Sequence, residues 1–282
     1  MRISNFIWNE FIYGGHWFSI SASSIVFSTM IILSLQIRWD LLIIVYLLLQ
    51  CVYNYNHYKE LHLDSLSSSE RPNHLNIYIK SLPYITLIYG ISFIFLIVYF
   101  GNIESLIFCI FLLFLGISFT SIFKKFTAKV IGFKNYYASF TLGSLIIFTA
   151  IYCSYELNNH LFELFLFSTF RFFISSSFSD IKDMPIDKKQ NLITFPIYFG
   201  KQKFLTFLHI FNFITFIPFF IIIIETNLNF IPFLFFTYFY TFYYIAKANN
   251  RNVDIQSLTN IVVDGEFIFW PFLLLIGLKI TA

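Results

Sequence analysis

Residues 103–122, with the sequence IESLIFCIFLLFLGISFTSI, decide what class of protein this is. The stretch contains one charged residue, Glu104, and about 20 apolar residues in a helix cross the hydrocarbon core of a bilayer, which is roughly 30 Å thick. The other stretches of this kind lie near 14–35, 40–56, 80–99, 135–153, 160–178, 203–224, 229–246 and 260–279. The sequence therefore predicts an all-α polytopic membrane protein with nine transmembrane helices.

The composition of the whole chain agrees with this prediction. Of 282 residues, 58% are hydrophobic and only 12% are charged, whereas soluble domains have about 45–50% and about 25%. Half the usual charge cannot cover the surface of a soluble protein of this size, and so much apolar material excludes a disordered chain. Three widely spaced cysteines, an odd number, exclude a disulfide scaffold.

The Lys and Arg residues are distributed unequally between the two sides of the predicted helices. Fifteen of the 18 lie on the side of the N-terminus, Arg38 and Lys279 lie on the other side, and Arg171 lies within a predicted helix. Because cytoplasmic loops carry an excess of Lys and Arg, we predict a multi-pass protein of the cell membrane with a cytoplasmic N-terminus. The long charged connections are on this side, so an active site is also expected there.

The first of two acidic segments follows the second predicted helix. Asn56, Glu60 and Asp64 are spaced i, i+4 and i+8, so on a helix they lie along one face. Arg71 and Pro72 follow shortly after.

The second acidic segment follows the sixth predicted helix. Asp180, Asp183 and Asp187 are spaced i, i+3 and i+7 and again share one helix face. Pro185 lies between them, and proline normally ends or kinks a helix, so Asp187 is expected to extend from the start of a loop.

Carboxylates that share a helix face repel one another unless a cation lies between them. Two such segments on the cytoplasmic side indicate a shared divalent-metal site, and oxygen ligands together with a substrate phosphate are typical of Mg²⁺. The neighbouring Lys and Arg residues would then neutralise a pyrophosphate. The alternative interpretation is that these are solvated loop charges beside membrane helices.

At these residues the chain resembles the UbiA-type superfamily of intramembrane prenyltransferases. That family has a first motif Asn-Asp-x-x-Asp-x-x-x-Asp followed by Arg-Pro, and a second motif Asp-x-x-Asp-x-x-x-Asp followed by Thr-x-Pro-x-x-x-Gly. The matching positions here are Asn56, Asp64, Arg71 and Pro72 for the first motif, and Asp180, Asp183, Asp187, Thr194, Pro196 and Gly200 for the second. Two positions of the first motif depart from the pattern, because His57 and Glu60 stand where the family has Asp. Lys124, Lys125, Lys134 and Asn135 resemble the basic loop that follows the fourth helix in this family.

The resemblance covers the whole chain and implies one UbiA-like domain over 1–282, a nine-helix bundle with a central cavity. The implied activity is Mg²⁺-dependent transfer of a polyprenyl group from its diphosphate to a lipophilic acceptor in the bilayer, without a nucleic-acid partner. The implied metal ligands are Asn56, Glu60, Asp64, Asp180, Asp183 and Asp187, of which the four aspartates are the catalytic candidates. The implied diphosphate-binding residues are Arg71, Lys124, Lys125 and Lys188, and His57 and Arg171 are auxiliary or acceptor-binding candidates.

Polar residues inside a membrane helix are costly and are therefore functional candidates. Arg171 is interpreted as a partner for acceptor or diphosphate, or equally as one half of an internal ion pair with a residue such as Glu163. Asp264 and Glu266 open the last predicted helix, where they are either buried donors or acceptors or, as we expect, the interfacial start of that helix. The isolated histidines His16, His160 and His209 are expected to be packing or interface residues.

Three other functions compete with prenyl transfer. A transporter is compatible with many helices, but transporters usually carry charges near the midplane and helices broken by Gly or Pro. An inactive relative that retains the fold is suggested by His57. Alcohol phosphotransfer also uses paired Asp motifs, but with a Gly and Arg pattern that this chain lacks. The sequence leaves the acceptor open, as an aromatic acid, an isoprenoid or a glycerol lipid.

Overall fold

The computed structural model describes the backbone of residues 3–64, 70–226, 228–250 and 252–281, and their side chains except those of residues 61–64. All regular structure in this part of the chain is helical, which confirms the all-α prediction. The α-helices are α1 (Ile3–Tyr13), α2 (His16–Ile32), α3 (Trp39–Asp64), α4 (Glu70–Leu75), α5 (Leu82–Phe100), α6 (Ile103–Ser118), α7 (Phe133–Gly143), α8 (Leu145–Tyr152), α9 (Asn159–Lys189), α10 (Phe195–Phe199), α11 (Lys201–Ile214), α12 (Phe216–Thr226), α13 (Phe236–Lys247), α14 (Ile255–Ser257) and α15 (Phe269–Thr281). Short 3₁₀ or π segments connect them: η1 (Phe119–Phe123), η2 (Lys124–Ala128), η3 (Ile231–Phe235), η4 (Leu258–Val263) and η5 (Glu266–Ile268).

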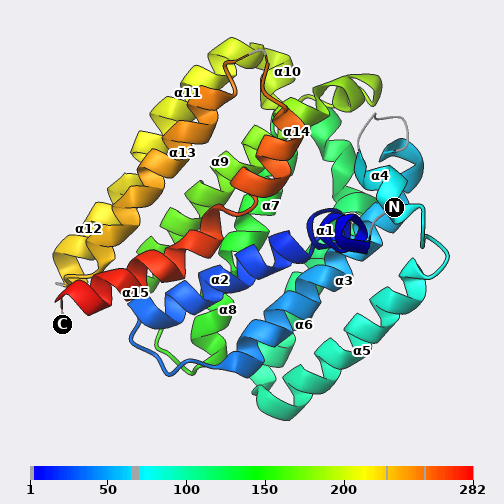
Figure 1. The fold of residues 1–282 in the computed structure, drawn as a ribbon. Helices are drawn as coiled ribbons and strands as arrows, with labels where there is room; N and C mark the ends of the chain where they lie inside the picture. The colour runs from blue at the N-terminus through cyan, green and yellow to red at the C-terminus, as the bar shows by residue number, and fades with distance from the viewer. Residues whose placement is uncertain (1–2, 65–69, 227, 251, 282) are drawn as a thin grey trace.

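Helix α9 lies in the middle of the bundle, with α3, α5 and α6 on one side and α11, α12 and α13 on the other (Figure 1). It packs against α7, α8, α11 and α12 along its length, and against α10, α14 and η4 toward its C-terminal end. The short helices α4, α10 and α14 gather at one end of the bundle (Figure 1).

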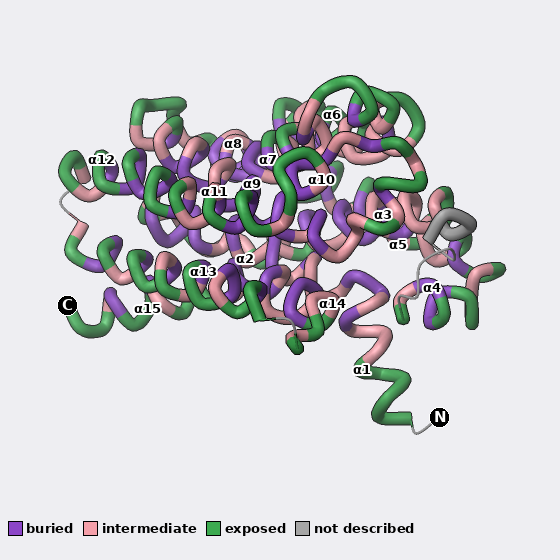
Figure 2. The backbone as a smooth tube through the Cα atoms, turned by 90° about the horizontal axis from the view of Figure 1, so that it is seen from above, coloured by how far each residue is buried: buried purple, intermediate pink, exposed green. Residues whose placement is uncertain are grey.

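The buried core is apolar and aromatic, and the outside of the bundle is apolar too. In the core, Phe167 stacks on Trp270, with ring centroids 5.1 Å apart. Helices α5 and α6 bury few of their apolar residues and expose others, for example Leu87 and Phe114, whereas α9 is largely buried (Figure 2). An apolar exterior of this extent is typical of a surface that faces lipid.

Five helical segments of the described chain are long and apolar enough to cross a membrane. They are Leu82–Phe100, Ile103–Ala128, Asn159–Lys189, Lys201–Thr226 and Ile255–Thr281. A sixth is obtained if α1 and α2, which meet at a bend of 50°, are taken as one span. Each of the nine stretches read from the sequence contains helix, but their count as nine spans and the orientation of the N-terminus remain predictions.

The turns at the end of the bundle opposite α4 and α14 are set by asparagine caps. Asn102 accepts a hydrogen bond from the backbone N–H of Ser105 at 2.7 Å, and the Ser105 hydroxyl accepts one from the backbone N–H of Asn102 at 2.9 Å. This capping box satisfies two otherwise unpaired donors and starts α6 immediately after α5. Asn158 caps α9 in the same manner, through a hydrogen bond from the Leu161 N–H.

The expected break at Pro185 is not observed. Helix α9 continues through Pro185 to Lys189, so Asp187 lies on the helix and not in a loop. Proline removes the hydrogen bond to the carbonyl four residues earlier and crowds that carbonyl, but it does not force a helix to end when flanking packing holds the turn. Here Ile181 and Asp187, on either side of Pro185, are both buried.

Candidate active site

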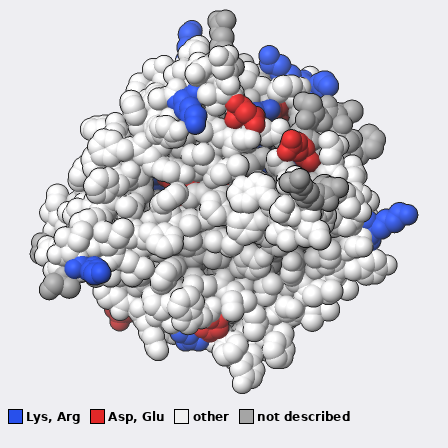
Figure 3. All heavy atoms as spheres, in the orientation of Figure 1, with Lys and Arg blue, Asp and Glu red and all other residues white. Residues whose placement is uncertain are grey.

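A cavity of about 1150 Å³ lies at the end of the bundle that carries α4 and α14. Residues of α3, α4, η2, α7, α9 and η4 line it. The charged residues of its wall are Glu60, Arg71, Lys124, Lys134, Lys182, Asp183, Asp187, Lys188, Lys189, Asp254 and Asp264. A broad surface without charges separates charged side chains over this end from those at the opposite rim (Figure 3). The cavity therefore combines both signs of charge at one end of an otherwise apolar bundle.

An apolar chamber of about 220 Å³ adjoins this cavity. The two share wall residues Phe18, Tyr53, His57, Phe119, Ala138 and Leu142. Beyond these, the chamber is lined mainly by aliphatic side chains of α3, α6 and α8, such as Leu49, Leu112 and Leu145. A ligand with a charged end and a hydrocarbon end would match this pair of spaces.

The second acidic motif is divided between the cavity and the protein interior. Asp183 and Asp187 line the cavity from successive turns of α9. Asp180 does not line it: its side chain is fully buried and accepts hydrogen bonds from Lys134 Nζ at 3.0 Å and from Asn135 Nδ2 at 2.9 Å. Asp180 thus holds two residues of α7 in place.

Lys134 is the cation nearest to these carboxylates, and it was not among the predicted diphosphate ligands. Its Nζ lies 3.7 Å from Asp183 Oδ2 in addition to its bond to Asp180. Burial opposes its charge, but Asp180, Asp187 and Asp183 outweigh that effect and raise the pKa of Lys134 well above its usual value. The ammonium group is therefore held charged beside the motif.

A glycine positions Lys134 at the start of α7. Gly132 has φ +65°, and a Cβ atom there would lie 2.0 Å from Cε2 of Phe195. Its N–H donates to the Ile193 carbonyl at 3.0 Å, which joins this turn to the segment after α9. Only glycine fits both the left-handed backbone and the close approach.

The first acidic motif lies on α3, as the i, i+4 spacing predicts. Glu60 lines the cavity and forms an ion pair with Lys124 at 2.5 Å. Asn56 faces the apolar chamber, where its amide donates to the Gly116 carbonyl and accepts from the Thr120 hydroxyl. The side chain of Asp64 lies outside the described residues.

The departure from the family pattern at His57 lies where the cavity and the chamber meet. Its ring packs 4.3 Å from that of Tyr53, and its Nε2 is 3.5 Å from Nη1 of Arg71. His57 therefore belongs to the cavity wall, beside the arginine of the first motif.

The predicted basic residues are only partly brought together. Arg71, Lys124 and Lys188 line the cavity. Lys125, which follows Lys124 in η2, is exposed and does not line it. Successive residues of a helical turn point in different directions, so only one of the two lysines can face inward.

A polar wall that the sequence interpretation missed lies opposite the end of α9, on η4. Asn260 is buried, and its Oδ1 accepts hydrogen bonds from Lys182 Nζ at 2.7 Å and from Arg71 Nη2 at 3.2 Å. Asp264 also lines the cavity. It lies inside the helical segment Ile255–Thr281 and not at its start, so the expected interfacial helix start is not observed. The i, i+4 spacing of Asn260 and Asp264 was the sequence signal that could have indicated a shared polar helix face here.

Arg171 is not part of the cavity. It is fully buried and donates to Glu266 from Nε at 3.0 Å and also from Nη2, so the internal ion pair is the correct interpretation, but its partner is not Glu163. Asn212 and Thr241 accept its remaining donors. Glu266, which was expected at the interface, is fully buried as well.

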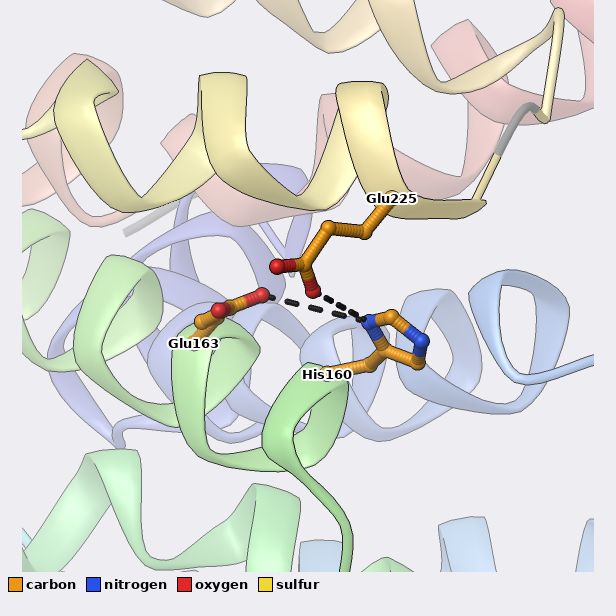
Figure 4. Close-up of side chains that lie close together, drawn as sticks. All are labelled: His160, Glu163 and Glu225. Carbon is orange, nitrogen blue, oxygen red and sulfur yellow. Dashed lines mark ion pairs between the residues drawn. The ribbon is translucent and has the colours of Figure 1, made fainter.

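His160 is not isolated, contrary to expectation. Its Nδ1 lies 3.1 Å from a carboxylate oxygen of Glu225 on α12 and 3.9 Å from one of Glu163 (Figure 4). The three side chains join the first turn of α9 to the end of α12 and are partly exposed. Glu163 and His160 lie about 36 Å and about 40 Å along α9 from Asp187, at a rise of about 1.5 Å per residue, so the three side chains belong to a separate place in the molecule.

The carboxylates of the cavity suit a magnesium ion. Within the described part of the chain, Asp187 Oδ2 is buried and has no hydrogen-bond partner, and such an oxygen is costly unless a ligand satisfies it. Asp183 presents a second carboxylate to the same space, and Glu60 a third. Mg²⁺ favours oxygen donors of this kind, with water and substrate phosphate as further ligands.

No protein-family model matches the sequence, and no curated protein matches it. Solved structures match its fold over nearly the whole chain. The apo structure of a UbiA homologue from Aeropyrum pernix K1 has a TM-score of 0.72 at 13% identity, covering 94% of this chain and 98% of that one. A UbiA homologue from Archaeoglobus fulgidus bound to GPP and Mg²⁺ has a TM-score of 0.63 at 14% identity, with the same coverage. The chain has the UbiA-type fold.

A third similar structure is a digeranylgeranylglyceryl phosphate synthase, with a TM-score of 0.61 and 18% identity over 98% of this chain and 99% of that one. The resemblance to the UbiA-type superfamily inferred from the two motifs is thus confirmed in the fold.

Proposed function

We propose that this UbiA-type protein is an intramembrane prenyltransferase that transfers a polyprenyl group from a polyprenyl diphosphate to an aromatic or lipid acceptor. The observation that carries the proposal is the joined pair of spaces, because a charged cavity and an apolar chamber accommodate the two ends of a prenyl diphosphate. The A. fulgidus homologue of the same fold is bound to GPP and Mg²⁺, which supports the same ligand class here.

Asp183, Asp187 and Glu60 would hold Mg²⁺, together with Asp64. When bound, the metal neutralises charge on the diphosphate and so favours its departure. Asp180 contributes by holding Lys134 beside the other carboxylates. Asn56 contributes by joining α3 to α6 at the chamber.

The cationic side chains stabilise the leaving diphosphate. Lys124, Lys134, Lys188 and Arg71 line the same cavity as the carboxylates, and hydrogen bonds from such groups strengthen as negative charge develops on the leaving oxygen. The apolar chamber keeps the hydrocarbon chain out of water. Aromatic faces at the junction, such as that of Tyr53, stabilise the allylic cation that forms when the carbon–oxygen bond breaks.

The proposed topology is nine membrane spans with a cytoplasmic N-terminus and a cytoplasmic active site. It is supported by the excess of Lys and Arg at the cavity end. A Lys129→Cys variant, at an exposed position after η2, should react with a membrane-impermeant thiol reagent only after the cell is opened. Labelling in intact cells would contradict this orientation.

The decisive experiment measures diphosphate release from geranylgeranyl diphosphate by the purified protein in lipid nanodiscs. Release should require Mg²⁺, stop on chelation, and be lost in Asp183→Asn. Glu225 on α12 lies beside His160 in the first turn of α9, far from the cavity. Glu225→Gln is therefore the matched carboxylate control and should retain the activity.

An inactive relative is the second candidate, and one observation favours it. Lys134 Nζ lies within 4 Å of both Asp180 and Asp183, so the protein supplies its own cation to the motif. If the folded protein binds neither Mg²⁺ nor geranylgeranyl diphosphate, it is an inactive relative and the proposed prenyl transfer is excluded.

A further inference from the structure

The cavity has two polar walls that meet on α9. Lys182 and Asp183 are consecutive, and successive residues of a helix point about 100° apart. Asp183 faces Lys134, 3.7 Å away, whereas Lys182 faces Asn260, 2.7 Å away. The proposed diphosphate and metal site uses the first wall and Arg71, which leaves Lys182, Asn260 and Asp264 of the second wall without a role.

The second wall consists of Lys182, Arg71, Asn260 and Asp264. The Asn260 carboxamide oxygen accepts from both cations and fixes them side by side. Helices α9 and α4 supply the two cations, and Asn260 and Asp264 come from η4, which packs against α9, and the residue that follows it. The wall is therefore a constructed polar surface and not a run of adjacent charges.

Asp264 and Asp187 differ from the other carboxylates of the cavity, and Asp187 already has a role as a proposed metal ligand. Glu60 is paired with Lys124, Asp183 lies near Lys134, and Asp254 accepts from the Ser257 hydroxyl and the Gln256 N–H. Within the described residues, the Asp264 carboxylate makes neither a side-chain hydrogen bond nor an ion pair within 4 Å. It faces the cavity with its proton-accepting oxygens available.

We propose that Asp264 is the general base that accepts the acceptor's proton, and that Lys182 and Asn260 position the polar head of the acceptor beside it. This inference rests on the proposed prenyl transfer. It assigns the second wall to the second substrate, a molecule whose nucleophilic hydroxyl or ring carbon carries a proton that must leave.

The bonds balance without a further reagent. A lone pair or ring π pair of the acceptor forms the new bond to C1 of the prenyl group, and the C1–oxygen bond breaks with its electron pair leaving on the diphosphate. The acceptor's O–H or ring C–H proton goes to the Asp264 carboxylate and then to water in the cavity. A positioned base of this kind contributes about 10²–10⁴-fold to a rate.

The charged groups around Asp264 come from several elements. Lys182 and Asp183 of α9 and Arg71 of α4 are its electrostatic neighbours. Asp254 is the charged residue that precedes Asp264 most closely in the sequence. On α1, which packs against η4, Glu10 is hydrogen-bonded to His74 at 2.7 Å. The groups around Asp264 are therefore two cations and one like charge, and none of them forms an ion pair with it within 4 Å among the described residues.

The test compares Asp264→Asn with Asp254→Asn and Asp264→Glu in nanodiscs. Asp254 lines the same cavity but caps α14, and asparagine caps a helix as well as aspartate does, so Asp254→Asn is a matched control. Two readouts are taken: the Kd for geranylgeranyl diphosphate with Mg²⁺, and the pH dependence of prenyl transfer to a panel of hydroxybenzoate, polyprenol and prenylated glycerol phosphate acceptors.

Asp264→Asn should keep the donor Kd within about twofold and lose about 100-fold in kcat. The acid limb of the pH profile should disappear, Asp264→Glu should restore part of kcat, and Asp254→Asn should match the unmodified protein. A Lys182→Met variant should raise the KM for the acceptor more than it lowers kcat.

Several outcomes would overturn the assignment. An Asp264→Asn protein that transfers at the unmodified rate, or retains the acid limb, excludes Asp264 as the base. Loss of donor binding in Asp264→Asn with donor binding intact in Asp264→Glu would assign this carboxylate to the donor site instead. An unmodified protein that binds no donor would refute the proposed function, and the base with it, whereas donor binding with a failed Asp264 test refutes the base alone.

Discussion

Helix α9 carries two polar groups of opposite character, around Arg171 and around Asp187, about 24 Å apart along its axis. Around Arg171, each guanidinium nitrogen has an acceptor on a neighbouring element, and the whole network is buried. Around Asp187, a buried carboxylate oxygen has no hydrogen-bond partner within the described residues. The difference separates a structural network, which is complete in itself, from a site that a ligand completes.

The largest expected effect is on activity, from a change at the incomplete group. Asp187→Asn should reduce Mg²⁺-dependent diphosphate release about 1,000-fold, because a lost metal ligand costs several kcal/mol of transition-state stabilisation. Thermal stability in detergent should stay the same or rise, since a buried charge without a partner is removed. If Asp187→Asn released diphosphate at the unmodified rate but had a lower melting temperature, Asp187 would stabilise the fold and would not hold the metal.

The next largest effect is on stability, from a change at the complete network. Glu266→Gln leaves the buried Arg171 guanidinium without its counter-charge and should cost about 3–5 kcal/mol of unfolding free energy. The donor Kd of the protein that remains folded should not change. The double variant Arg171→Met with Glu266→Leu removes both charges and should recover most of the loss. A double variant as unstable as the single one would contradict this account.

A change at Gly132, which positions Lys134 beside the acidic motif, should have moderate effects on both stability and donor binding. Gly132→Ala places a methyl group 2.0 Å from the Phe195 ring in a left-handed turn, which should cost about 1–3 kcal/mol. It should also weaken donor binding several-fold, because the turn positions Lys134. Adding Phe195→Leu relieves the contact but not the backbone strain, so it should restore part of the stability. Thermal unfolding and donor titration measure the two effects.

The smallest effect is expected at the far end of α9. Glu225→Gln removes an ion pair with His160 that is about 40% exposed on both sides. Such pairs contribute about 0.2–1 kcal/mol, so the melting temperature should change little and diphosphate release not at all. A large loss of stability would show that this cluster resembles the Arg171 network more than its exposure suggests.

Much of the fold could be predicted from local sequence. Each apolar stretch is helical, and the spacing of Glu60 with Asn56, and of Asp183 with Asp187, correctly placed both motifs on helix faces. Helical periodicity depends only on neighbouring residues, which is why it can be read from one chain. The break predicted at Pro185 was wrong, because the packing that keeps α9 helical through this residue comes from elements distant in the sequence.

The partners of the site residues could not be predicted in the same way. Arg171 lies 95 residues from Glu266, and Lys182 lies 78 residues from Asn260. No periodicity relates residues so far apart, and the nearby Glu163 was a misleading candidate. For the same reason the hydrogen bonds that Lys134 and Asn135 donate to the predicted metal ligand Asp180 could not be read from the sequence.

The unbroken course of α9 through Pro185 has a consequence for how this protein can change in evolution. The Arg171 network anchors the rotational phase of the helix, and the direction of Asp183 and Asp187 follows from it with no intervening joint. Insertion of one residue between the two groups would turn both aspartates by about 100° out of the cavity while leaving the anchor intact. Lineages that keep the chemistry are thus bound to conserve the length of this interval, whatever side chains fill it.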